Sequence, residues 1–174
     1  MLRRARLDET AAITATMKAS ARALGAAFYD PTQNAGFEAY VAVCDEQLVG
    51  DGTYFVVDAD GVLAACGGWS KRDKLFTGND GQAGGARMLV PGAEPARVRA
   101  MFVHPAYARR GLGRKILEAC EEDARREGFT VAEMMATLPG VPLYRACGYE
   151  EVAPFDVMLP NGVALPCIRM RKAL

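Results

Sequence analysis

Residues 98–136 constrain the fold of this chain more than any other segment. Residues 98–103 predict a strand, residues 111–127 predict a strongly amphipathic helix that ends at Gly128, and residues 129–136 predict a second strand. A strand, a helix and a strand in this order build a β-α-β unit, in which both strands belong to the same sheet and run parallel. We therefore expect this unit to form the centre of the fold.

The turn that enters this helix combines glycines with basic residues. The first N–H groups of a helix have no partner inside it, and the helix dipole adds about half a positive charge there, so glycines let phosphate oxygens approach closely. Four cations crowd the same end, where each opposes the dipole by about 0.3–1 kcal/mol; they are Arg109, Arg110, Arg114 and Lys115. A bound polyanion reverses this penalty, so the turn predicts a pyrophosphate site. The alternative is an ordinary surface helix behind a glycine-containing turn.

Other phosphate-binding motifs fit this turn less well. Gly111 and Gly113 are followed by Ile116, so the third glycine of a dinucleotide fingerprint is missing. The sequence also lacks GxxxxGK[ST], the nucleoside triphosphate loop. Coenzyme A is therefore the polyanion that fits best.

The rest of the chain predicts further strands and helices around this unit. Strand patterns occur in residues 2–7, 53–57, 62–69, 152–159 and 163–170. The second and third of these strands are predicted to form one hairpin, and the fourth and fifth another. Helical patterns occur from Asp8, as the cap, to Gly25, more weakly within residues 30–50, and briefly in residues 142–147. We expect one domain over residues 1–174, of the α/β (α+β) class. Its single mixed, mostly antiparallel central sheet has six to seven strands and is flanked by about four helices.

Composition excludes several classes of function. Lys plus Arg total 21 and Asp plus Glu total 21, so the charge balance predicts no attraction to nucleic acid or to an anionic membrane. The five widely spaced cysteines and the single histidine argue against a disulfide framework and against a metal site. No segment approaches the ~20 apolar residues of a membrane helix, and no signal peptide is evident. A cytoplasmic protein is expected.

Residues 108–113 resemble the acetyl-CoA-binding motif of the GNAT superfamily of N-acetyltransferases, which reads R/Q-x-x-G-x-G/A. The motif falls on Ala108, Arg109, Arg110, Gly111, Leu112 and Gly113, so alanine stands where the family has Arg or Gln. That change removes one side-chain contact, but family members hold the pyrophosphate mainly through backbone N–H groups. Residues 143–149 (LYRACGY) resemble a second family signature, aromatic-Tyr-x-x-x-Gly-aromatic, and the two motifs occur in the family's order.

The resemblance implies a set of cofactor contacts. The backbone of Met101, Phe102 and Val103 would pair with the pantetheine arm, and a bulge there would leave an N–H free to stabilise the oxyanion of the tetrahedral intermediate. Arg114 follows the motif at the start of the helix, and Thr137 stands where many members have Asn. Acetyl-CoA is thus the implied co-substrate, without a metal.

The resemblance also implies catalytic roles. Tyr144 would protonate the departing thiolate; the alternative is an amphipathic core residue whose hydroxyl is satisfied at the edge of the core. Many members carry a glutamate base on the fourth strand, but Arg97 occupies that position, so Glu133 is our leading candidate for the base. A strand glutamate is more often solvated or salt-bridged, and a water chain is the other route for the proton.

The acceptor is the least determined part of the prediction. Phe28, Tyr29, Tyr40, Trp69 and the glycine-rich connection over residues 71–95 could form an acceptor cleft under a flap, or simply hydrophobic core beside a loop. We expect an N-acetyltransferase that moves the acetyl group from acetyl-CoA to a primary amine of a small molecule or peptide, by direct attack in a ternary complex. The alternative is a non-catalytic acyl-CoA-binding sensor. Strand edges of the final hairpin could pair two copies as a homodimer.

Overall fold

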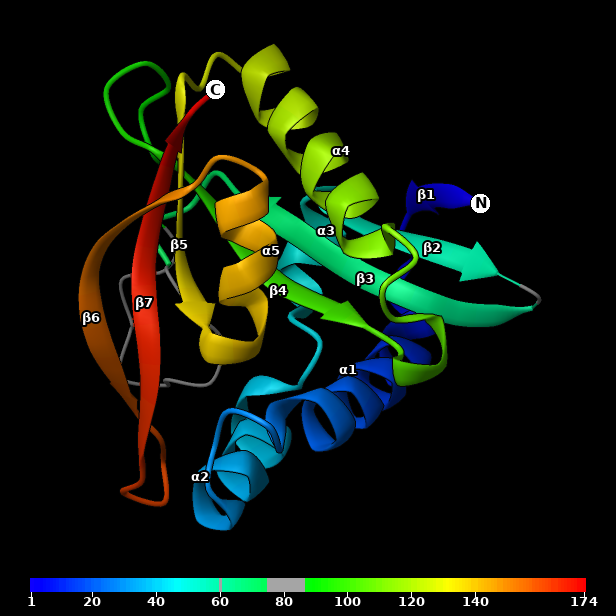
Figure 1. The fold of residues 1–174 in the computed structure, drawn as a ribbon. Helices are drawn as coiled ribbons and strands as arrows, with labels where there is room; N and C mark the ends of the chain where they lie inside the picture. Colours follow the sequence, from blue (N-terminus) through cyan, green and yellow to red (C-terminus); the bar gives the residue numbers. More distant parts are fainter. Residues whose placement is uncertain (60, 75–86) are drawn as a thin grey trace.

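A seven-stranded sheet organises the molecule in the computed structural model, which describes residues 1–59, 61–74 and 87–174 (Figure 1). The strand order is β1-β2-β3-β4-β5-β7-β6. The strands are β1 Leu2–Arg4, β2 Tyr54–Ala59, β3 Val62–Ser70, β4 Ala96–Val103, β5 Val131–Thr137, β6 Glu150–Met158 and β7 Ala164–Ala173. Among the described pairings only β4 and β5 are parallel. The mixed, mostly antiparallel sheet and the central β-α-β unit are therefore confirmed.

Helices cover both faces of this sheet. The helices are α1 Thr10–Gly25, α2 Pro31–Gly36, α3 Glu46–Gly50, α4 Leu112–Arg126 and α5 Val141–Ala146. One apolar core lies beneath α1 and contains Ile13, Met17 and Phe102. Two others lie beneath α4 and α5, where Ile116 and Leu117 are fully buried. The apolar face of α4 thus packs on the sheet as its amphipathic pattern predicts.

The start of the first helix differs from the prediction. Asp8 does not cap α1, because residues Leu7–Glu9 form a 3₁₀ turn that precedes the helix. Glu9 accepts the N–H of Arg6 at 2.9 Å and pairs with Arg3, so the acidic side chain that organises this start lies one residue later.

The weakly helical residues 30–50 form three short pieces. Asp30 caps α2 by accepting the N–H of Gln33 at 2.8 Å, a π-helical turn follows over Phe37–Val41, and Asp45 caps α3. Gly36 ends the first piece where a β-carbon would come within 2.5 Å of Leu159. The chain therefore folds closely around the end of the β6–β7 hairpin.

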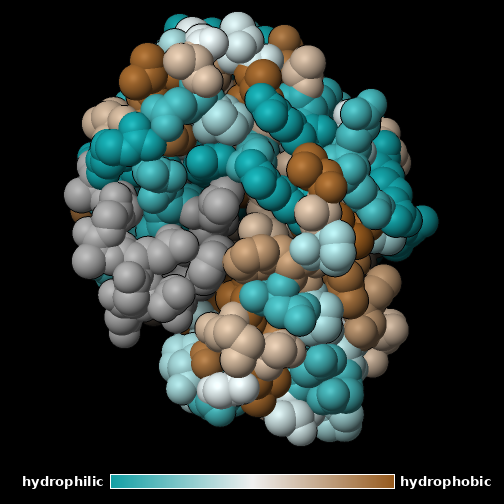
Figure 2. Space-filling view, turned by 90° about the vertical axis from the view of Figure 1, so that its left-hand side faces the viewer, coloured by the Kyte–Doolittle hydropathy of each residue, from teal (hydrophilic) through white to brown (hydrophobic). Residues whose placement is uncertain are grey.

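The C-terminal hairpin forms the edge of the sheet. Almost every residue of β6 is exposed, including the apolar Val152, Phe155 and Met158. This strand lies on the side of the molecule that Figure 2 shows, where apolar residues gather among polar ones. Pairing of two copies along this edge stays a prediction.

In the described part of the chain no helix has the length and apolar character needed to cross a membrane.

Candidate active site

Strands β4 and β5 separate in the middle of the sheet. Their register contains only Ala96↔Ala132 and Arg97↔Glu133, after which the two strands diverge (Figure 1). Beyond Arg97, the edge of β4 that faces β5 has no strand partner among the described residues. The backbone of Met101, Phe102 and Val103 therefore belongs to an open edge, where a ligand could pair as an added strand.

A bulge distorts β4 at this opening. Cys66 pairs with Phe102 and Gly68 pairs with Arg99, so Ala100 and Met101 lie opposite the single residue Gly67. Ala100 has φ 53°, a left-handed conformation that alanine rarely adopts. The bulge thus re-aims the peptide groups of β4 at the point where the strands part.

Two adjoining cavities open beside the bulge. The strand cavity, about 60 Å³, is lined by Val41, Val98, Arg99, Ala100, Met101, Phe102, Met134, Met135, Thr137, Tyr144, Val157, Leu165 and Cys167. The helix cavity, about 110 Å³, is lined by Ser20, Leu24, Gly25, Phe37, Met101, Phe102, Val103, Gly113, Thr137, Pro139, Gly140, Leu143 and Tyr144. The two share Met101, Phe102, Thr137 and Tyr144, so they meet at the bulge.

The glycine turn at the start of α4 is open. Gly111 has φ 78°, and a β-carbon built on it would find no atom within 4 Å. No side chain caps the helix, and within the described chain the N–H groups of Gly111, Leu112, Gly113 and Arg114 donate no hydrogen bond. Arg109 also has a positive φ of 64°, so the turn presents a concave run of backbone N–H groups.

Positive charge surrounds this turn without compensation from nearby carboxylates. The four cations Arg109, Arg110, Arg114 and Lys115 are exposed, and none forms an ion pair with a described residue. Arg110 lies over the ring of Tyr107 at 5.1 Å, and Arg114 donates to the carbonyl of Ala146 at 3.1 Å. The arrangement suits a ligand with several negative charges.

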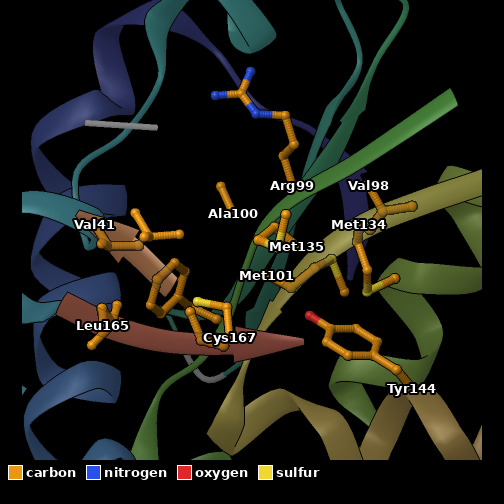
Figure 3. A pocket seen from close by; sticks show the side chains of 13 residues that line it. Val41, Val98, Arg99, Ala100, Met101, Met134, Met135, Tyr144, Leu165 and Cys167 are labelled. Atoms are coloured by element: carbon orange, nitrogen blue, oxygen red, sulfur yellow. The ribbon is translucent and has the colours of Figure 1, made fainter. Parts of the chain in front are cut away.

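Tyr144 lies where the two cavities meet. Its ring packs against Gly140, where a β-carbon would come within 2.6 Å, and stands edge-on to Tyr149 at 6.1 Å. The hydroxyl points into the strand cavity, and the guanidinium of Arg99 lies at the far end (Figure 3). Burial, with smaller effects of Cys120 and Cys147, raises the pKa of Tyr144 above its ordinary value, so the hydroxyl stays protonated at neutral pH.

The sequence profile of the acetyltransferase (GNAT) family matches residues 18–149, well over half of the chain. The chain belongs to this family. The match begins inside α1 and ends at Tyr149, so it contains the open glycine turn, the bulge and Tyr144.

Solved structures share the fold of this GNAT protein at low sequence identity. A GCN5-related N-acetyltransferase from Rhodopseudomonas palustris has a TM-score of 0.75 and 21% identity, over 100% of this chain and 95% of its own. The PaiA N-acetyltransferase from Thermoplasma acidophilum, in complex with coenzyme A, has a TM-score of 0.67 and 12% identity, and the match covers 100% of this chain and 98% of the PaiA chain. YncA from Salmonella typhimurium, with its cofactor acetyl-CoA, has a TM-score of 0.63 and 21% identity, and the match covers 100% of this chain and 93% of the YncA chain. No curated protein matches in a sequence comparison.

The structure places Glu133 outside both cavities of this GNAT protein. Its side chain is 1% exposed, one carboxylate oxygen pairs with Arg97, and the other lies 2.8 Å from Arg169. Arg97 comes from the adjacent strand β4 and Arg169 from β7. Both oxygens are thus engaged in ion pairs, and Glu133 is not brought together with Tyr144.

The aromatic residues suggested for an acceptor cleft lie in several different places. Trp69 is fully buried beneath α4 and donates to Asp123 at 3.0 Å. Tyr29 is buried and donates to the carbonyl of Pro166 at 2.8 Å, while Phe28 is exposed. Neither these residues nor Tyr40 line the two cavities. The flap expected over residues 71–95 falls partly on residues 75–86, which lie outside the described residues.

Two buried contacts near the site were not predicted from the sequence. Arg99 donates to Asp45 at 2.7 Å, and Lys74 lies 3.4 Å from the same carboxylate. Burial raises the pKa of Asp45, but these two cations outweigh it and hold that pKa below its ordinary value. Tyr54 donates to the carbonyl of Ala100 in the bulge at 2.9 Å.

No group of three or more potential metal ligands occurs among the described residues.

Proposed function

We propose that this GNAT acetyltransferase moves the acetyl group of acetyl-CoA to a primary amine, by direct attack in a ternary complex. The observation that carries the proposal is that the start of α4 at Gly113, the unpaired edge of β4 and Tyr144 all border the two adjoining cavities. A nucleotide-linked thioester needs these three features in that order: a site for its phosphates, an extended edge for its arm and a proton donor at its sulfur.

The residues of the turn suit the diphosphate. The backbone N–H groups from Gly111 to Arg114 would donate to its oxygens, and Arg109, Arg110 and Arg114 would balance its charge. Ala108 supplies backbone only, which is the main means of phosphate binding implied by the family motif. The helix cavity, whose wall includes Val103 and Thr137, leads from this end toward the bulge.

Acyl transfer from the thioester passes through a tetrahedral oxyanion. A peptide N–H at the bulge, in the stretch from Met101 to Phe102, would donate to that oxygen, and such a preorganised donor contributes about 3–4 kcal/mol of transition-state stabilisation. The bulge makes this N–H available to the oxyanion, because it turns a peptide group of β4 away from the regular hydrogen-bond ladder of the sheet.

Tyr144 would supply the proton for the leaving thiolate. The amine nitrogen first bonds to the carbonyl carbon and gives this oxyanion; when the oxyanion collapses to the amide, the carbon–sulfur bond breaks and the sulfur takes the Tyr144 hydroxyl proton. The tyrosinate then regains a proton that the attacking amine has released through solvent. We do not route this proton through Glu133, because its oxygens are held by Arg97 and Arg169.

A covalent acyl-enzyme is not required in this scheme. Cys167 lines the strand cavity, but burial raises the pKa of its thiol to about 12. At neutral pH this cysteine is a thiol, which is a poor nucleophile. Direct attack by the amine therefore fits the site better than an intermediate on Cys167.

The strand cavity is the proposed acceptor site. Its walls are mainly apolar, with Val41 and Leu165 on one side and Arg99 at the far end (Figure 3). A small amine with an apolar body fits these walls better than a polycation, because the cavity offers mainly apolar contacts and its one arginine is already paired with Asp45. A peptide acceptor would present its terminal amine here.

The test is release of coenzyme A thiol over a panel of amines, amino acids and peptides, with the wild type and Tyr144→Phe. Acceptor-dependent release that falls strongly in Tyr144→Phe supports the proposal. If acetyl-CoA raises the melting temperature but no acceptor ever releases thiol, the protein is an acyl-CoA-binding sensor instead. If acetyl-CoA does not bind at low salt, both readings fail.

A further inference from the structure

A buried tyrosine two strands away holds the bulge of β4. Tyr54 lies on β2, is fully buried and donates its hydroxyl proton to the carbonyl oxygen of Ala100 at 2.9 Å. Tyr54 lines neither cavity, so it does not reach a bound substrate. Its contact reaches across the whole width of β3 to the part of β4 that borders both cavities.

Two adjacent glycines on β3 make this contact sterically feasible. Gly68 is the cross-strand partner of Tyr54, and a β-carbon on Gly68 would come within 2.6 Å of the tyrosine ring. A β-carbon on Gly67 would come within 2.2 Å of the sulfur of Met101 and 3.2 Å of its Cα. One glycine therefore makes room for the ring, and the other lets the bulge approach β3.

The Ala100 carbonyl needs such a partner. The bulge removes this residue from the regular ladder, and its φ of 53° is unfavourable for alanine. A residue in such a conformation persists when its surroundings fix it, and the Tyr54 hydroxyl is the contact that fixes it here. A carbonyl held at one end of a peptide plane also fixes the N–H at the other end, because the peptide group is planar. The planar unit that begins at the Ala100 carbonyl ends at the N–H of Met101.

We propose that Tyr54 is a positioning residue of the active site, which orients the bulge peptide that stabilises the oxyanion. The inference rests on the proposed function, because it concerns the same acyl transfer. Tyr54 acts on the rate without touching the substrate, so it should influence the transition state more than ground-state binding of acetyl-CoA.

The test compares Tyr54→Phe with Thr16→Val. Thr16 also donates a buried hydroxyl to a strand carbonyl at 2.9 Å, that of Leu63 on β3, away from the bulge. Both variants lose one hydroxyl-to-carbonyl hydrogen bond, so their melting temperatures should fall by similar amounts. Only Tyr54→Phe should lower kcat, by about 10- to 100-fold, with the KM for acetyl-CoA within about threefold of the wild type.

A second variant keeps the test decisive if Tyr54→Phe folds poorly. Ala100→Gly removes the side chain that makes the left-handed φ unfavourable, so the bulge should depend less on its tyrosine partner. In the Ala100→Gly background Tyr54→Phe should therefore keep kcat close to that of Ala100→Gly alone, a comparison that does not require the single variant Tyr54→Phe.

Several results would overturn the inference. An unchanged kcat in folded Tyr54→Phe, an equal loss of kcat in Thr16→Val, or a rise in KM without a fall in kcat each refutes it while the proposed function stands. A wild type that releases no thiol with any acceptor refutes the proposed function itself, and the positioning role falls with it.

Discussion

Replacing Gly111 by alanine tests whether the turn of α4 binds phosphate. The residue has φ 78°, and its added methyl group would point into open space at the helix N-terminus. In the free protein the substitution has only a conformational cost, about 1–2 kcal/mol for an L-residue in the left-handed region. For a domain of this size that corresponds to a fall in melting temperature of about 2–8 °C.

The effect on acetyl-CoA should be larger than this strain implies. The methyl group occupies the space that phosphate oxygens need beside the N–H groups of Gly111 and Leu112, so we expect affinity to fall at least tenfold, or about 1.4 kcal/mol. At a ligand concentration of about 100 times the wild-type Kd, binding stabilises the wild type by about 2.7 kcal/mol. The same concentration should stabilise Gly111→Ala by about 1.4 kcal/mol or less.

Gly162 provides the matched control. It has φ 80° in the β6–β7 turn, and a β-carbon there also meets no atom within 4 Å. Gly162→Ala should therefore lose similar stability without ligand but keep the full acetyl-CoA-dependent shift in thermal denaturation. If both variants show the wild-type shift, the turn does not hold the phosphates and the site must be reassigned.

Three further predictions concern the proton donor, the buried ion pairs and the cations. Tyr144→Phe should lower kcat by about 10²- to 10⁴-fold and leave acetyl-CoA affinity unchanged. Because burial raises the pKa of Tyr144, its proton should be lost only above the ordinary value near ~10, so steady-state kcat should show no decline from this group between about pH 6 and 9. Glu133→Gln should lower the free energy of unfolding in urea by about 2–4 kcal/mol, because among the described residues Arg97 keeps only the carboxylate of Asp73 at 3.5 Å and half-exposed Arg169 loses the counter-charge of Glu133, with the shape of the pH–rate profile unchanged. A shifted limb of that profile would restore Glu133 as the base. Arg109→Gln combined with Arg110→Gln should raise the KM for acetyl-CoA about tenfold and flatten its dependence on salt, and an unaltered salt dependence would contradict the charge argument.

Local sequence patterns predicted the ends of the central helix and the hairpins, because residues close together in the sequence determine these features. The helix expected over residues 111–127 is α4, Leu112–Arg126, because a strong apolar period and the flanking Gly111 and Gly128 define both ends. The hairpins follow from alternating strands joined by glycine turns, and Asn161 and Gly162 lie in the last turn as expected.

Features that depend on contacts between distant strands were not accessible from the sequence. The alternation of β5 implies that Glu133 and Met134 face opposite sides, but it does not say which side holds the site or that arginines from β4 and β7 flank the carboxylate. The family resemblance implied a bulge near Met101, but Tyr54 and Ala100 are 46 residues apart, and no pattern in the sequence pairs that bulge with Tyr54. Trp69 could be read as a cleft residue or as core, and its packing beneath α4 shows that it is core.

The short seam between β4 and β5 also bears on how such a protein can change. Additional hydrogen-bonded pairs beyond Arg97↔Glu133 would extend the sheet and strengthen the unliganded fold, yet they would close the gap in which we propose that the thioester binds. Stabilising substitutions selected or engineered for heat resistance are therefore expected throughout the protein except between β4 and β5, because function there requires the two strands to stay unpaired.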